Sequence, residues 1–293
     1  MNHNRKRLLL LSFVLILFLA LFYSKDLIQK NMTPKTVTLF SLTNENSSQF
    51  LLTGESLSQK LIKNGSKWFV EKEGKQFTAD PEKVSNLIQT LNGLTEGTIV
   101  SKNKNKHADF GIGTEIVVVK TPERERTLYL GKPYGSSARY ARMDKQEEVF
   151  VGDNLQSILI NSDFRDLKTH ALDDDSSLQS MEIDMNGVKT QLTKSKDEWS
   201  MGNKKTKSGT VSYYINDLKN LTATDIVEAN TKVTDTNPAL TIRLKTQKQE
   251  NTIDFVKYDD KSYAMKSSSY PWLFLIPEVN VASLQKQEKD FLE

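Results

Sequence analysis

Residues that could do catalytic chemistry are few and scattered in this chain of 293 residues. After the N-terminal segment only two histidines occur, His107 and His170. Neither has a second His or a Glu at i+3 or i+4, which is the spacing that zinc hydrolases use. No Gly-x-Ser-x-Gly motif is present, so the nucleophile turn of the α/β-hydrolases is missing as well. The sequence therefore predicts no hydrolytic centre of either kind.

The glycine-containing segments do not complete a nucleotide-binding motif. Gly111-Ile112-Gly113 begins like a dinucleotide loop, but Ile116 stands where the third Gly is needed. Gly131-Lys132 lacks the upstream Gly of a phosphate-binding loop and is followed by Pro133. Cys is absent, which excludes disulfides, iron–sulfur clusters, thiolate zinc sites and Cys nucleophiles. We therefore expect no cofactor and no metal.

Neighbouring carboxylates occur at Asp173-Asp174-Asp175 and at Glu147-Glu148. On a strand or loop, adjacent side chains point apart, which suits solvent better than paired acid and base catalysis. The three Asp also lack the alternate spacing and central Gly of a calcium loop. The sequence therefore favours a protein without enzymatic activity, and the alternative is an enzyme whose catalytic residues are dispersed along the chain.

The best candidate for a binding surface is the segment Arg139-Tyr140-Ala141-Arg142, together with Tyr134. A Tyr between two Arg on a strand can present a planar ring and two fixed positive charges, which suit a carboxylate, a phosphate or a peptide. The alternative is an edge strand that its charges protect from aggregation. We take Tyr134, Arg139, Tyr140 and Arg142 as the candidate residues for binding a ligand or partner.

Two stretches of the chain repeat the same pattern of elements. Each has a short strand with a Trp, at Trp68 or Trp199, then an amphipathic segment and a short β-branched run. The apolar positions of the amphipathic segments are Val84, Leu87, Ile88, Leu91 and Leu94 in the first and Val211, Tyr214, Ile215, Leu218 and Leu221 in the second. Both sets follow i, i+3, i+4, i+7, i+10, which places every member on one face of an α-helix.

The match between the two stretches continues downstream in the same order. The matching pairs are Val117 and Val119 with Ile242 and Leu244, Thr127–Leu130 with Thr252–Phe255, Tyr140-Ala141 with Tyr263-Ala264, and Val149–Val151 with Leu273–Leu275. A repeat of more than about a hundred residues is too long for a solenoid unit. The sequence predicts an α+β fold with two tandem repeats, each a mostly antiparallel sheet with an amphipathic helix packed on it.

The N-terminus has the pattern of a membrane anchor. Arg5-Lys6-Arg7 precedes Leu8 to Tyr23, which carries no charge and would span ~24 Å as a helix. Arg7 and Lys25 can snorkel to cover the remaining thickness. The poor cleavage sites after this segment favour an uncleaved signal anchor over a signal peptide. The basic cluster keeps the N-terminus in the cytoplasm, so the rest of the chain is expected outside.

The net positive charge of the chain comes from this N-terminal cluster. The sequence has 40 Lys and Arg against 37 Asp and Glu, and Arg5, Lys6 and Arg7 account for the whole excess. The part after Tyr23 is therefore neutral overall, and no global field exists that would attract nucleic acid.

These observations predict the organisation of the whole chain. We expect a cytoplasmic tail at 1–7, a single transmembrane helix at 8–23, a stalk at 24–35, a first repeat unit at 36–167, a linker at 168–177 and a second repeat unit at 178–293. The linker is placed at the Asp-rich segment because this segment has few apolar residues and is expected to be exposed to solvent.

The chain resembles the bacterial domain-of-unknown-function family 4340 over nearly its whole length. The features that match are the basic anchor, both Trp units and the motifs Asp109–Ile112, Leu130-Gly131, Tyr140–Arg142, Val149–Val151 and Phe164–Asp166. One departure is that the first unit lacks the Pro usual after the Phe-Gly turn, while the second keeps an equivalent in Asn237-Pro238. The resemblance implies an extracytoplasmic α+β protein without established activity, often encoded beside ABC transporter components. It supplies no catalytic residues.

We therefore expect a cell-membrane protein, held by Leu8 to Tyr23, whose C-terminal part lies outside the cytoplasm. Its expected role is accessory: binding, or scaffolding a membrane protein complex such as an ABC transporter or an envelope complex. The alternative is an enzyme that modifies the cell wall or lipid through an active site without a known motif.

Overall fold

The structure is a computed structural model that describes residues 38–72, 74–153, 155, 162–196, 198–207, 209–228, 231, 233, 237–268 and 270–292. The expected cytoplasmic tail, transmembrane helix and stalk lie outside these residues. Within the described part, no helix is both long enough and apolar enough to cross a membrane. The chain divides into two compact units, one with residues 38–75 and 82–163 and one with residues 76–81 and 164–292.

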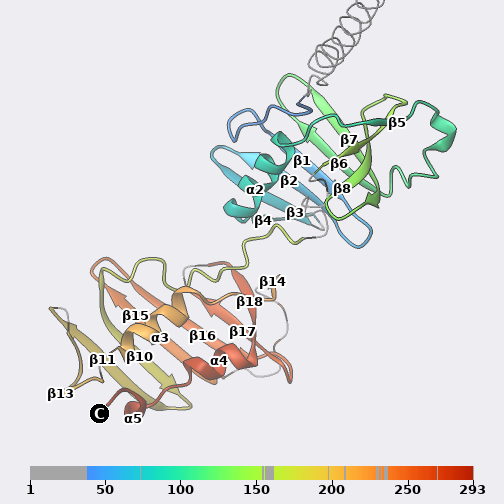
Figure 1. The fold of residues 1–293 in the computed structure, drawn as a ribbon. Helices are drawn as coiled ribbons and strands as arrows, with labels where there is room; N and C mark the ends of the chain where they lie inside the picture. The colour runs from blue at the N-terminus through green and yellow to red at the C-terminus, as the bar shows by residue number, and fades with distance from the viewer. Residues whose placement is uncertain are drawn as a thin grey trace, which may run out of the picture. The chain divides into compact units, whose positions relative to one another are not determined.

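Nine of the described strands, β1 to β9, form the sheet of the first unit, although residues 76–78 of β4 are grouped with the second unit (Figure 1). The strands are β1 (Gln49–Thr53), β2 (Ser58–Asn64), β3 (Lys67–Lys72), β4 (Lys75–Thr78), β5 (Ile99–Ser101), β6 (Glu115–Lys120), β7 (Glu125–Tyr134), β8 (Ala138–Met143) and β9 (Val149–Gly152). Their order across the sheet is β4-β3-β2-β1-β6-β7-β8-β9-β5. Helix α2 (Pro81–Asn92) joins β4 to β5, and the short helix η1 (Lys104–Lys106) follows β5.

The second unit contains a sheet of nine described strands with the same arrangement. The elements are β10 (Leu178–Met185), β11 (Val188–Ser195), β12 (Glu198–Met201), β13 (Lys204–Lys205), α3 (Thr210–Lys219), β14 (Asp225–Glu228), β15 (Leu240–Thr246), β16 (Glu250–Lys257), β17 (Ser262–Ser267), β18 (Trp272–Pro277), α4 (Glu278–Leu284) and α5 (Glu288–Phe291). The order is β13-β12-β11-β10-β15-β16-β17-β18-β14, so each position holds the strand numbered nine higher than in the first sheet. The predicted duplication, with antiparallel sheets, is confirmed.

The central strand pairs of the two sheets have the same register. The facing pairs are Phe50–Val119 and Leu52–Val117 in the first sheet and Met181–Leu244 and Ile183–Ile242 in the second. All eight side chains are almost completely buried. Because side chains alternate between the faces of a strand, these apolar pairs fix which face of each sheet meets the core. The predicted match of Val117 and Val119 with Ile242 and Leu244 is therefore confirmed.

Each unit buries the apolar stripe of its amphipathic helix. The buried residues are Val84, Leu87, Ile88 and Leu91 in α2 and Val211, Tyr214, Ile215 and Leu218 in α3. The α3 residues belong to one hydrophobic cluster with the central strands of the second sheet, so this helix packs on the sheet (Figure 1). The two predicted helices are confirmed at their first four apolar positions, whereas Leu94 and Leu221, predicted on the same helix faces, lie beyond the helix ends and are buried there.

The third matching strand is displaced by one residue from the predicted alignment. Ala141 lies opposite Leu130 and Phe150, and Met265 lies opposite Phe255 and Phe274. Ala141 is therefore equivalent to Met265, and the match of Tyr140-Ala141 with Tyr263-Ala264 was wrong. A shift of one residue exchanges the two faces of a strand, so Tyr140 has no Tyr at the equivalent position of the second unit.

The Asp-rich segment before β10 packs against the second unit. Ala171 and Leu172 are buried and belong to the hydrophobic cluster of that unit. Lys168 pairs with Thr222 in an isolated bridge, and the Asp175 carboxylate lies 2.6 Å from Lys219 Nζ. These contacts make the segment part of the surface of the second unit, although Asp173 and Asp174 themselves are exposed.

Candidate functional site

The predicted binding surface on β8 is divided between the two faces of the first sheet. Ala141 and Met143 are buried, so they mark the core face of the strand. Arg139 shares that face because it is two residues from Ala141, whereas Tyr140 and Arg142 lie on the opposite face. The two arginines therefore do not flank one ligand from the same side of the strand.

Arg139 is held by groups of its own unit. Its Nε and Nη2 donate to the Gly131 carbonyl at 2.9 and 2.7 Å, and Nη1 donates to the carboxylate of Glu115. The side chains of Arg139 and Glu115 are only 14% and 11% exposed. This geometry gives Arg139 a structural role at the end of the core face.

Arg142 folds over the turn that follows β8. Its guanidinium lies 4.0 Å from the centre of the Tyr129 ring, and its Nη1 donates to the backbone carbonyls of Asp144 and Gln146. A guanidinium stacked on an aromatic face gains a cation–π interaction. Arg142 is therefore partly engaged, on the same face of the sheet as Tyr140.

Tyr134 and Tyr140 come together on the outer face of the first sheet. Their ring centres are 5.4 Å apart in an edge-to-face arrangement, and Tyr140 also lies 4.8 Å from Phe110. Tyr134 is 52% exposed. Of the four predicted residues, the structure thus brings together the two tyrosines, with Arg142 on the same face.

A small cavity lies at the hairpin between β6 and β7. We call it the first hairpin pocket; it has a volume of about 130 Å³ and is bounded on its other side by residues 40–46. Its apolar lining residues are Phe40, Leu42, Val119 and Pro122, and its positively charged ones are Arg124 and Arg126. The hairpin is closed by Thr121, whose N–H and hydroxyl both donate to the Arg124 carbonyl, at 2.9 and 3.1 Å.

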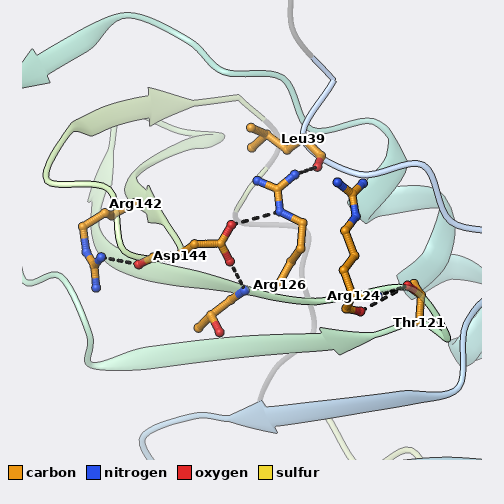
Figure 2. A network of polar contacts seen from close by, with 7 residues as sticks. Leu39, Thr121, Arg124, Arg126, Arg142 and Asp144 are labelled. Atoms are coloured by element: carbon orange, nitrogen blue, oxygen red, sulfur yellow. Dashed lines mark hydrogen bonds and ion pairs between the residues drawn. The ribbon is translucent and has the colours of Figure 1, made fainter.

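Arg126 is fixed in this pocket (Figure 2). Its Nε donates to Asp144 Oδ2 and its Nη1 to the Leu39 carbonyl, both at 3.0 Å. The other Asp144 carboxylate oxygen accepts the Thr127 N–H at 2.7 Å. The guanidinium carbon also lies 5.8 Å from the centre of the Phe40 ring. With only 22% of its side chain exposed, Arg126 is a pre-positioned cation.

Arg124 extends beyond the hairpin on the same side as Arg126, as Figure 2 shows. The spacing of two residues along an extended chain gives both side chains the same direction. Within the described part of the chain the Arg124 guanidinium has no hydrogen-bond or ion-pair partner. The first hairpin pocket thus combines one anchored and one free guanidinium.

The second unit has a cavity at the equivalent hairpin, between β15 and β16. We call it the second hairpin pocket; its volume is about 310 Å³. Its polar lining includes His170, Asp173, Thr246, Lys248, Asn251 and Tyr270. Thr246 closes this hairpin as Thr121 closes the first, because its N–H and hydroxyl donate to the Gln249 carbonyl at 2.9 and 3.0 Å.

The hydrogen bonds beneath the two pockets are equivalent, but the charged groups are not. Asn251 takes the place of Arg126 and donates to the Ala171 carbonyl at 3.2 Å. Ser268 takes the place of Asp144, since its hydroxyl accepts the Thr252 N–H at 3.0 Å and also donates to Asn251 Oδ1 at 2.6 Å. Gln249 stands where the first unit has Arg124. The second hairpin pocket therefore has hydrogen bonds at the equivalent positions but lacks these three charged groups.

His170 lies at the edge of the second hairpin pocket, between two carboxylates. Its Nδ1 is 2.7 Å from Asp173 Oδ1 and its Nε2 is 2.8 Å from Asp166 Oδ2. Its ring is parallel to that of Tyr270, with centres 5.6 Å apart. Burial by itself would lower the pKa of His170, but the hydrogen bonds to Asp166 and Asp173 outweigh it and raise that pKa. The geometry suits an imidazolium that donates from both nitrogens.

These groups do not form a metal centre. In the ranges that the structure describes, no set of three or more His, Cys, Asp or Glu is arranged to hold an ion. No sequence motif predicted Arg124, Arg126 or Asp144 as functional residues. An alignment of the two repeats through their hairpins could have found these three residues. In that alignment the three charged positions correspond to the uncharged Gln249, Asn251 and Ser268.

Comparison with known proteins yields one match. A family model described as "Domain of unknown function (DUF4340)" matches residues 68–240, which include the helix of each unit and both Trp strands. No curated protein and no solved structure matches the chain.

Proposed function

The chain belongs to the DUF4340 family, and from that premise we propose that it is a membrane-anchored accessory protein that acts by binding. In this proposal Leu8 to Tyr23 is a transmembrane helix with a cytoplasmic N-terminus, and both repeat units lie outside the cytoplasm. The partner is a membrane protein complex, either an ABC transporter or another envelope complex, as the resemblance to this family suggests.

The observation that carries the proposal is the pair of hairpin pockets. Both units keep the same strand order and the same Thr-closed hairpin, yet the polar side chains inside the pockets differ. Exchange of loop side chains on a constant scaffold is how folds acquire new binding specificities. Two related pockets with different charges therefore support a binding protein with two contact sites.

A second contact surface in this proposal is the outer face of the first sheet. Tyr134 and Tyr140 supply aromatic area and Arg142 supplies a positive charge, a combination that is enriched where partners bind. Arg139 is not part of this surface because it lies on the opposite face of β8, where Gly131 and Glu115 accept its hydrogen bonds.

The competing proposal is a wall- or lipid-modifying enzyme, and the observation in its favour is His170 at the mouth of the larger pocket. A general base needs a ring nitrogen that can take a proton from a substrate. Both nitrogens of His170 are engaged with carboxylates, at 2.7 and 2.8 Å. This arrangement stabilises a charged ring and opposes its use as a base, so we prefer the binding role.

Site-specific photo-crosslinking in membranes tests the binding role. A photoreactive amino acid placed at Glu123 or Lys248, on the tips of the two hairpins, should form an adduct with a membrane protein. The matched controls are Ser66 and Lys196, exposed residues in the turns before β3 and β12. Adducts that are equally strong at all four positions would argue against specific contact at the hairpins. Turnover of a wall or lipid substrate by the purified protein would replace the binding role with the enzyme.

A further inference from the structure

We propose that the first hairpin pocket binds a carboxylate carried on an apolar group. This inference deepens the proposed binding function, since it names the chemical class that one of the two pockets accepts. It rests on the guanidinium pair, on the comparison with the second unit and on the apolar walls of the cavity.

The guanidinium pair supplies donors aimed at the cavity. A guanidinium has five N–H donors, and Arg126 uses one on Asp144 and one on Leu39. The remaining donors of Arg126 and all the guanidinium donors of Arg124 have no acceptor within the described residues. Arginine forks match the planar geometry of a carboxylate, and a fork already held in place loses little side-chain entropy on binding.

The comparison between the units shows that the fold does not need these charges. Gln249, Asn251 and Ser268 occupy the positions of Arg124, Arg126 and Asp144, and the second hairpin keeps the same closing hydrogen bonds. Unlike Arg139 and Glu115, which pair with one another, the two arginines of this pocket keep donors that have no acceptor among the described residues. A ligand that carries a charge accounts for them.

The charge balance of the pocket limits the charge of its ligand. Asp144 neutralises Arg126, and Glu123, an exposed carboxylate in the lining, offsets Arg124, so these four groups carry no net charge. A dianion such as phosphate would therefore leave two uncompensated negative charges. A carboxylate adds a single negative charge and can still accept hydrogen bonds from both guanidinium groups.

The walls and size of the pocket define the rest of the ligand. Phe40, Leu42, Val119 and Pro122 line it with apolar surface. A volume of about 130 Å³ holds a head group and a few carbon atoms, so the remainder of a larger ligand must lie outside. A short aliphatic acid and the terminal carboxylate of a peptide both have this chemistry.

A pair of probes that differ in one group tests the inference. N-acetyl-leucine carries its carboxylate next to an apolar side chain, whereas N-acetyl-leucinamide lacks the charge. Titration of the full-length protein in nanodiscs, followed by ligand-observed NMR, should give an affinity at least tenfold higher for the acid. N-acetyl-glycyl-leucine separates a peptide terminus from a simple acid by binding more tightly. Inorganic phosphate should bind more weakly than the acid.

Substitution by the residues of the second unit locates the site. The variant Arg124→Gln with Arg126→Asn and Asp144→Ser should lose at least tenfold in affinity for N-acetyl-leucine. Lys120→Gln, which removes an exposed positive charge of the same hairpin outside the pocket, should bind normally. If the triple variant is not folded, Arg124→Gln alone decides, because the Arg124 guanidinium has no hydrogen bond or ion pair to lose within the part of the chain that the structure describes.

The inference fails if the amide binds as well as the acid, if phosphate binds more tightly or if neither charge-removing variant lowers the affinity. Its failure is distinguishable from that of the proposed function. Crosslinking from Glu123 in the absence of acid binding would reject the carboxylate and keep the accessory role. Acid binding that Arg124→Gln abolishes, without any crosslinking, would keep the carboxylate and reject the membrane partner.

Discussion

At the scale of single residues, His170 makes stability depend on pH. The hydrogen bonds to Asp166 and Asp173 outweigh burial and raise its pKa above the ordinary value of about 6.5. A raised folded-state pKa means that the stabilising contribution is complete below the unfolded pKa and is lost as the pH rises through the folded one. Tyr270, which stacks on the ring, also has a raised pKa and stays neutral in this range.

His170→Gln should therefore remove a pH-dependent contribution of about 1 kcal/mol to the free energy of unfolding. Denaturant titrations at pH 5.5 and 8.5 should show the wild type losing this amount between the two values, and the variant losing less. His107→Gln is the matched control, since the His107 ring hydrogen-bonds to the backbone carbonyl of Glu147 and, among the described residues, to no carboxylate. An identical pH profile for His170→Gln and wild type would show that the two carboxylates do not stabilise the charged ring.

Arg139 offers a second test at this scale. Arg139→Ala removes the guanidinium from the largely buried carboxylate of Glu115, and it should cost about 3 kcal/mol of unfolding free energy. The second unit has Leu240 and Tyr263 at the equivalent positions, as the strand registers show. Glu115→Leu combined with Arg139→Tyr should therefore recover most of the loss. Full stability of Arg139→Ala alone would make this arginine available for binding.

At the scale of elements, the strongest periodicities were predictable from the sequence. The helix faces and the central strands follow from apolar spacing because burial acts on whole faces of an element. The alignment of β8 with β17 was not predictable. Both strands contain a Tyr-Ala pair, but the register that decides which residues are equivalent is set by the neighbouring strands. The split of Arg139 from Arg142 follows from a spacing of three residues, which puts two side chains on opposite faces of a strand.

Equivalent helices should respond alike to equivalent substitutions. Leu91 and Leu218 are both completely buried, on the sheet-facing sides of α2 and α3. Leu91→Ala and Leu218→Ala should each cost about 3 kcal/mol, from lost burial and an incompletely filled cavity. Chemical denaturation checks this, with Ser85→Ala and Ser212→Ala as exposed controls on the same helices. A cost below about 1 kcal/mol for only one of the two leucines would mean that the helices do not pack equivalently.

At the scale of the whole molecule, both pockets are built from residues that are far apart in the sequence. Arg126 meets Phe40 and Leu39, more than eighty residues away in the chain, and His170 meets Tyr270, a hundred residues away. Such contacts depend on which strands are neighbours in the sheet. Local periodicity does not report that order, so neither pocket follows from the sequence pattern of a single element.

The placement of the molecule in the membrane remains a prediction, and it concerns residues outside the described part. A run without charge after a basic cluster should keep the N-terminus in the cytoplasm, because Lys and Arg are retained on that side. A reporter enzyme that works only outside the cytoplasm, fused after Glu293, should be active. Replacing Arg5, Lys6 and Arg7 by Glu should reduce that activity, while the exchange of three exposed lysines elsewhere should not. N-terminal sequencing of the mature protein should find residue 1 or 2, and recovery of a soluble form that begins near Lys25 would replace the anchor by a cleaved signal peptide.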